Sequence, residues 1–82
     1  NYFEGPMNRL YDVDTNKKYS IVKISEELKR DSSVISFLKK NNILPGNKIY
    51  ISSTNKYSIT VSVTEDNFFG LDQFIAKRVF VS

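Results

Sequence analysis

The chain has 82 residues, of which 40% are hydrophobic and 26% are charged, and its formal net charge is +3. A chain of this length forms one small domain, and its core leaves little room for a deep enclosed active site. Cysteine and histidine are both absent, which excludes disulfides, thiolate metal sites and histidine-based acid–base catalysis. The composition therefore argues against an enzyme.

The first nine residues, 1–9, show no hydrophobic periodicity and are broken by Gly5-Pro6, so we expect them to lie outside the folded domain. One interpretation is an interdomain linker. The other is the remnant of a protease tag, in which case Met7 is the native start. The domain itself is predicted to occupy residues 10–82.

Two strands are predicted before the first helix. Residues 10–13 indicate a short strand, followed by turn-forming residues at 14–16. Residues 19–24 are rich in β-branched and aromatic side chains and predict a second strand. The charged stretch 26–30 is expected to be a connection.

An amphipathic helix is predicted at about 31–41. Asp31 has the position of an N-cap, and two lysines in the last turn lie near the negative end of the helix dipole. The apolar stripe of this helix consists of Val34, Ile35 and Leu38.

Turn chemistry and alternation define the strands that follow the helix. Leu44-Pro45-Gly46 predicts a type II turn, with the glycine in the position of positive φ. Apolar and polar residues then alternate at 48–51 and again at 57–64, which predicts two strands. Residues 54–56 form the predicted hairpin loop between them.

The C-terminal part is predicted to contain a helical turn at about 71–77 and a final strand at 79–81. Phe74, Ile75 and Ala76 are expected to point inward from this turn. The whole chain therefore predicts a mainly β fold: a small antiparallel barrel of five short strands with one short helix and one helical turn.

Charge and hydropathy limit the range of partners. The basic residues are spread along the chain and interrupted by acids, so no direct nucleic-acid contact is expected. No apolar run approaches the ~18–20 residues needed to span a bilayer, so no membrane insertion is expected. No signal-peptide pattern is present, and the expected location is cytoplasmic.

The order of elements and three sequence phrases resemble the FeoA-like domain. The phrases are Ile21–Ile24, Asn42–Ile51 and Ile75–Val81. The resemblance covers about seventy residues and implies an SH3-like barrel. Such domains occur free-standing in bacterial ferrous-iron transport and at the C-terminus of metal-dependent repressors of the DtxR/MntR family.

Two departures favour the repressor setting. Free-standing members carry a Pro- and Gly-containing hairpin after the third strand, whereas residues 52–57 contain neither. Gly70-Leu71-Asp72 also stands where those members tend to have an arginine. The resemblance thus implies a non-catalytic regulatory domain of an iron- or manganese-dependent repressor, whose partners are the N-terminal DNA-binding and dimerisation domains. The alternative is a free-standing accessory protein of ferrous-iron transport that docks on the permease.

The resemblance also implies a candidate metal ligand, Asp31, because some repressors of the family bind an ancillary metal through a carboxylate at this place. The partner position holds Val34, which cannot coordinate a metal, and helix capping competes for the Asp31 carboxylate. Glu26 and Glu27 offer hard oxygen atoms, although adjacent acids in a loop are usually solvated. We therefore expect no firmly bound cofactor in this domain, with Fe²⁺ or Mn²⁺ as the metal of the parent system.

Aromatic side chains are the candidates for partner binding. SH3-like barrels can bind extended peptides against aromatic grooves, and Tyr50, Phe68 and Phe69 are the proposed contacts here. Because neighbouring residues of a strand point to opposite faces, Phe68 and Phe69 cannot both face inward. One of them is expected near the surface, where a partner can reach it.

Overall fold

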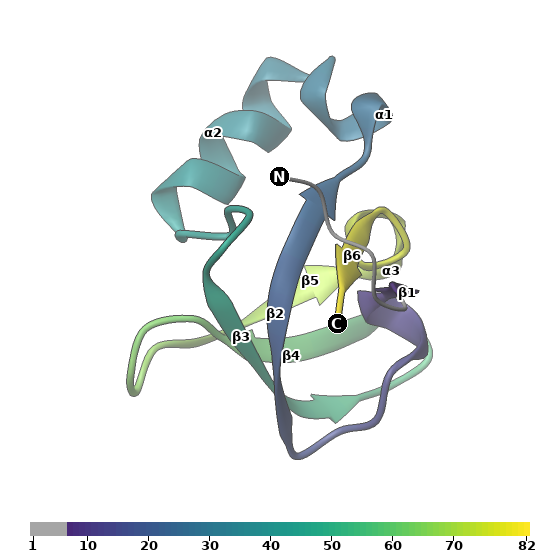
Figure 1. Cartoon of the computed structure of the whole chain (residues 1–82), viewed down its shortest axis with the longest axis vertical. Helices are drawn as coiled ribbons and strands as arrows, with labels where there is room; N and C mark the ends of the chain where they lie inside the picture. Colours follow the sequence, from purple (N-terminus) through teal and green to yellow (C-terminus); the bar gives the residue numbers. More distant parts are fainter. Residues whose placement is uncertain (1–6) are drawn as a thin grey trace.

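Six antiparallel strands form the sheet in a computed structural model that describes residues 7–82 (Figure 1). Their order in the sheet is β1-β6-β2-β3-β4-β5. The strands are β1 (Asn8–Arg9), β2 (Lys17–Ile24), β3 (Lys48–Thr54), β4 (Ser58–Ser62), β5 (Phe68–Asp72) and β6 (Val79–Val81). The helices are the 3₁₀ turn η1 (Leu10–Asp12), α1 (Glu26–Lys29), α2 (Ser32–Lys40) and α3 (Gln73–Ala76). This is the mainly β, SH3-like fold that the sequence predicts.

Strand β2 belongs to both halves of the sheet. Its first half pairs with β3, with Tyr19 opposite Ile49, and its second half pairs with β6, with Ile24 opposite Val79. A bulge at Val22 separates the two halves, because the pairing with β6 shifts between Ile21 and Lys23. In Figure 1, α1 and α2 lie together beyond one end of β2, and α3 lies beside β6.

The core consists of the alternate residues that the sequence pattern assigns to the inner face. Ile49 and Ile51 of β3 and Ile59 and Val61 of β4 are all buried. The remaining buried hydrophobic residues are Leu10, Ile21, Ile24, Leu28, Leu38, Ile43, Leu71, Ile75, Ala76, Val79 and Val81.

Helix α2 forms as its sequence predicts. The Asp31 side chain accepts hydrogen bonds from the backbone N–H groups of Ser33 and Val34, which would otherwise lack partners in the first turn. Leu38 is the fully buried residue of the helix. The chain leaves the helix through Asn42, whose φ of 60° is left-handed.

The turn between α2 and β3 has the predicted geometry. Gly46 has a φ of +96°, and the N–H of Asn47 donates to the carbonyl of Leu44 over 3.1 Å. The Gly46 N–H donates in turn to the carbonyl of Ile21 in β2, over 2.8 Å. This turn therefore fixes where β3 begins relative to β2.

The elements differ from the prediction in three places. Asn8 and Arg9 form β1 and pair with β6, so these two residues lie inside the sheet. Residues 68–72 form β5, although a helical turn was predicted from about 71, so the sheet has six strands and not five. Residues 10–12 form a 3₁₀ turn where a strand was predicted. The cause is local: the Arg9 guanidinium binds both carboxylate oxygens of Asp12, over 2.7 and 3.1 Å, and these residues are one helical turn apart. The predicted linker or tag segment otherwise lies mostly outside the described residues.

Two further predictions about helices are corrected. Residues 26–29 form the helix α1, where a connection was predicted, because Leu28 is fully buried and anchors a turn that is otherwise charged. In α3, Ile75 and Ala76 point inward as expected, but Phe74 is 50% exposed. A single helical turn directs only part of its surface at the core. The guanidinium carbon of Arg78 lies over the Phe74 ring, 3.8 Å from its centroid.

Candidate protein-docking surface

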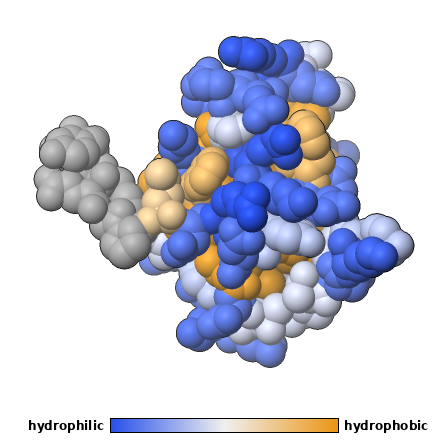
Figure 2. All heavy atoms as spheres, turned by 90° about the vertical axis from the view of Figure 1, so that its right-hand side faces the viewer, coloured by the Kyte–Doolittle hydropathy of each residue, from blue (hydrophilic) through white to orange (hydrophobic). Residues whose placement is uncertain are grey.

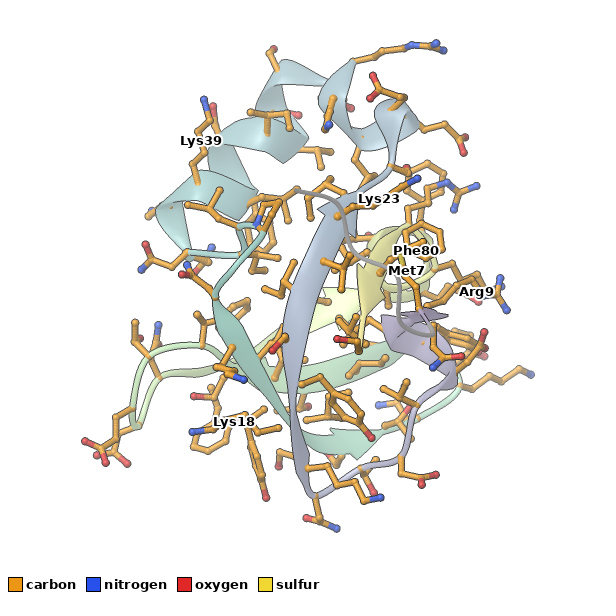
Figure 3. All side chains as sticks on the ribbon, viewed as in Figure 1. Met7, Arg9, Lys18, Lys23, Lys39 and Phe80 are labelled. Atoms are coloured by element: carbon orange, nitrogen blue, oxygen red, sulfur yellow. The ribbon has the colours of Figure 1, made fainter. Side chains whose placement is uncertain are left out.

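Four residues lie in one row across neighbouring strands. Lys18 of β2 pairs with Tyr50 of β3, Tyr50 pairs with Ser62 of β4, and Ser62 pairs with Phe68 of β5. Directly paired residues point to the same face of a sheet, so these side chains share the face opposite the buried isoleucines. Figure 3 shows Lys18 on the side of the molecule toward which the loop between β4 and β5 extends.

Tyr50 and Phe68 form an edge-to-face aromatic pair on this row. Their ring centroids lie 6.4 Å apart at an interplanar angle of 78°. The residue between them in the row, Ser62, has a small side chain that lets the two rings meet above β4. Phe68 is 52% exposed, so the pair presents an aromatic edge to solvent.

A cleft with a volume of ≈ 430 Å³ lies beside this aromatic pair. It is lined by Lys18, Tyr50, Ser62, Val63, Glu65, Asp66 and Phe68. The hydroxyl of Ser62 donates to the carbonyl of Thr64 over 2.8 Å, so it is engaged in the backbone of the turn. The cleft combines aromatic surface with charges of both signs, which suits recognition of a protein.

Phe69 lies on the other face of β5. Its ring packs against Phe37 of α2, with centroids 6.1 Å apart and an angle of 85°. Of the three residues singled out for partner binding, the structure therefore brings Tyr50 and Phe68 together and places Phe69 under α2. Partner binding by these residues stays a prediction.

Asp31 acts as the cap of α2. Besides the two backbone N–H groups, the hydroxyl of Ser33 donates to the same carboxylate oxygen over 2.7 Å. The hydrogen bond from the Ser33 side chain, followed by those from the backbone N–H groups of Val34 and Ser33, lowers the pKa of Asp31. The carboxylate is therefore anionic and already engaged.

The surroundings of Asp31 do not fit a metal centre. Within residues 7–82, no three acidic, histidine or cysteine side chains gather closely enough to hold a metal ion. Glu26 pairs with Lys29 over 3.4 Å and Glu27 pairs with Arg78 over 3.2 Å, so both acids of α1 have cationic partners. Metal ligation by Asp31 stays a prediction without a second ligand.

Several cleft residues were not singled out from the sequence. Lys18, Ser62, Glu65 and Asp66 line the cleft. Ser62, Glu65 and Asp66 come from one stretch, the end of β4 and the turn that follows it. Lys18 joins them only through the strand register, which places it opposite Tyr50.

The opposite side of the molecule is less suited to a large partner. Figure 2 shows the face that carries α1, α3 and β6, where hydrophilic side chains predominate and hydrophobic surface is confined to separate small areas. In Figure 3, Lys23 and Phe80 lie near each other on this side, and the Lys23 ammonium stands 5.7 Å from the Phe80 ring centroid. None of the helices in residues 7–82 has the length and apolar character needed to cross a membrane.

Comparison with known families decides the assignment. Residues 8–82 match the family model described as the FeoA domain. The chain belongs to the FeoA family. This FeoA domain is non-catalytic, in agreement with the prediction from composition. No curated protein sequence matches the chain.

Solved structures share the fold of this FeoA domain. A crystal structure of an iron uptake regulatory protein (FeoA) is 21% identical with a TM-score of 0.75, covering 93% of this chain and 94% of that one. The FeoA-like protein from Clostridium acetobutylicum is also 21% identical with a TM-score of 0.75, over 96% and 88%. A manganese-dependent transcriptional repressor in complex with manganese is 13% identical with a TM-score of 0.80, covering 95% of this chain but 37% of that one.

Proposed function

We propose that this FeoA domain acts as an accessory protein of bacterial ferrous-iron transport that docks on the cytoplasmic part of a ferrous-iron permease. Membership of the FeoA family supports this role, as does the likeness to an iron uptake regulatory protein over 94% of that protein's length. The repressor role, which the sequence departures favoured, has weaker support, because the manganese-dependent repressor is 13% identical to this chain and the iron uptake regulatory protein is 21% identical.

The observation that carries the proposal is the exposed aromatic pair Tyr50–Phe68 beside a cleft with charges of both signs. Aromatic side chains are enriched among the residues that contribute most to protein binding, and a ring that is 52% exposed has apolar area left for a partner to cover. Phe68 is therefore the proposed anchor. A non-catalytic partner of this kind acts by binding one state of the permease more tightly than another.

Binding to the purified ferrous-iron permease of the source organism, in detergent, tests the proposal directly. We expect Phe68→Ala to weaken binding about tenfold or more, as an anchor residue does. Tyr57→Ala is the matched control, because Tyr57 is an aromatic residue that is 67% exposed and lies at the opposite end of β4. The Tyr57→Ala variant is expected to bind the permease with the affinity of the wild type.

Iron uptake extends the same comparison to cells. In a strain that lacks the native protein, the wild type and Tyr57→Ala are expected to restore ⁵⁵Fe²⁺ uptake, whereas Phe68→Ala is not. If Phe68→Ala and Tyr57→Ala both bind the permease as tightly as the wild type, the assignment of the surface is wrong. No binding of the wild-type protein contradicts the proposed function.

The second candidate is the C-terminal domain of a metal-dependent repressor, supported by the TM-scores of 0.78 and 0.80 to manganese-dependent repressors. The reading frame upstream of Asn1 discriminates between the two. Codons for a winged helix in that frame favour the repressor. Metal-responsive DNA affinity that persists after deletion of this domain then argues against a regulatory role for it.

A further inference from the structure

Strand β5 forms an open edge of the sheet. It is the last strand in the sheet order and pairs only with β4 among the described residues 7–82. The Gln73 N–H donates to the Tyr57 carbonyl over 3.0 Å, and this bond fixes which residue pairs of the ladder are hydrogen-bonded. Because such pairs alternate in an antiparallel ladder, Phe69 and Leu71 bond to β4. The N–H and C=O groups of Phe68 and Gly70 therefore point away from β4.

This edge lacks the features that usually block strand addition. Natural edge strands are protected by lysine, proline, bulges or short length. The sequence of β5 is FFGLD, without lysine or proline, and its pairing with β4 runs without a shift over five residue pairs. At Gly70, an added Cβ would meet nothing within 4 Å, so the middle of the strand is open to an approaching backbone.

A groove of ≈ 350 Å³ runs alongside this edge, between β5 and α2. The packing of Phe37 on Phe69 holds the helix beside the strand. The groove is lined by Ser33, Val34, Phe37, Gly70, Leu71, Asp72 and Ile75. An open strand edge next to a partly apolar groove is the arrangement that binds an extended peptide, because the backbone bonds to the edge and alternate side chains enter the groove.

One end of the groove is acidic. Asp72 lines it, and Asp31 lies next to it through the hydrogen bond from the Ser33 hydroxyl. Each carboxylate uses one oxygen as a helix cap. The ion pairs found in residues 7–82 include neither of them, so both carboxylates are available to a cationic side chain of a ligand.

We propose that this groove binds an extended peptide segment of a partner protein, which adds a strand to β5 and places a lysine or arginine at the Asp31–Asp72 end. Pairing of β5 with the β5 strand of a second copy is a poorer fit, because the only charged residue of β5 is Asp72, which offers no cation to the acidic end. The groove shares no lining residue with the Tyr50–Phe68 cleft, although Phe68 belongs both to the edge strand and to the cleft. The inference does not depend on permease docking.

Hydrogen exchange of the free protein tests the geometry. We expect the Phe69 and Leu71 amides to be protected and the Phe68 and Gly70 amides to exchange at least about tenfold faster, because only the first two bond to β4. Equal protection of all four amides would show that the edge is already covered and would overturn the proposal.

Peptide titration followed by amide chemical shifts tests the ligand. The probe is the acetylated and amidated heptapeptide Lys-Val-Thr-Val-Thr-Val-Lys. Two further versions carry N-methyl groups on the valines in one case and on the threonines in the other. A strand added to β5 turns only alternate residues toward the edge, so one methylated peptide is expected to bind like the parent and the other about fivefold or more weakly. The Gly70 amide, which lies in the groove and outside the Tyr50–Phe68 cleft, should shift most.

Variants of the protein complete the test. Gly70→Pro removes an outward N–H that no bond of the fold uses and should weaken binding, whereas Gly70→Ala keeps it and should not. Asp72→Asn retains the cap of α3 and removes the charge, and we expect about two- to fivefold weaker binding that is lost in high salt. Equal binding of both methylated peptides, shifts confined to the Tyr50–Phe68 cleft, or β5-mediated dimerisation without peptide binding would each overturn the proposal.

Discussion

The turn at Gly46 allows a clean test of backbone conformation, because the chain contains a matched control. Gly46 and Gly70 both have open space around an added Cβ, so alanine clashes with nothing within 4 Å at either position. Only Gly46 has a positive φ, of +96°. The two Gly→Ala substitutions therefore differ in backbone strain and not in packing.

The expected magnitudes follow from this difference. A side chain in left-handed backbone costs about 1–2 kcal/mol, so Gly46→Ala should destabilise the domain by about that amount. Gly70→Ala should stabilise it by up to about 0.5–1 kcal/mol, since glycine is unfavourable inside a strand. For a domain of this size, 1 kcal/mol shifts Tm by about 4–8 °C, so we expect the two Tm values to differ by about 10 °C.

Thermal unfolding followed by circular dichroism measures the difference, with urea unfolding as a second assay. Gly46→Asn should fall between the wild type and Gly46→Ala, because asparagine tolerates positive φ. The chain itself uses asparagine in this way at Asn16 and Asn42, with φ values of 61° and 60°. Equal Tm values for Gly46→Ala and Gly70→Ala would refute the reasoning.

Three further predictions concern the core, the cap and the aromatic residues. Leu28→Ala should lower the free energy of unfolding by about 2–5 kcal/mol in urea titrations, whereas Leu44→Ala, at a side chain that is 36% exposed, should cost much less. Asp31→Ala should lower the stability of the domain, whereas Asp31→Asn should retain it because asparagine can also cap α2. The same result is expected with and without Mn²⁺. Because the folded-state pKa of Asp31 is lowered, the advantage of the wild type over Asp31→Ala is present above the ordinary pKa of 3.8 and should shrink in acid unfolding as the pH falls below it. Phe69→Ala should destabilise the domain more than Phe68→Ala, because Phe69 packs on α2 while Phe68 is 52% exposed; the reverse order in thermal unfolding would contradict the assigned faces.

The elements that the sequence predicted correctly depend on local signals. Asp31 caps the helix through bonds to residues two and three positions away. The Pro45-Gly46 turn is closed within four residues. The alternation in β3 and β4 reports which side chains face the core, whatever the neighbouring strands are.

The elements that were missed depend on distant contacts. Strand β1 is made by the backbone of Asn8 and Arg9, and polar exposed side chains give no sign that β6 lies beside them. Helix α1 has a single buried anchor, Leu28, in a charged stretch. Phe74 was expected inside because it is large and apolar, but α3 turns it outward beneath Arg78.

The candidate surface was predictable only in part. Alternation alone places Phe68 and Phe69 on opposite faces of a strand. The pairing of Phe69 with the buried Val61 decides which of the two faces inward. The row that joins Phe68 to Tyr50 and Lys18 depends on the register of four strands. No single segment of the sequence predicts that register.

The bulge at Val22 makes β2 sensitive to changes in length. Ile21 and Ile24 are both buried although they are three residues apart, a spacing that a regular strand cannot provide. A regular strand that kept Val22 in its pairing would direct Lys23 toward the barrel interior and Ile24 toward solvent. The hairpin loop at 55–57 makes no such demand on its length. Insertions and deletions are therefore expected to be tolerated at that loop, whereas one residue inserted between Lys23 and Ile24 would exchange the inside and the outside of the second half of β2.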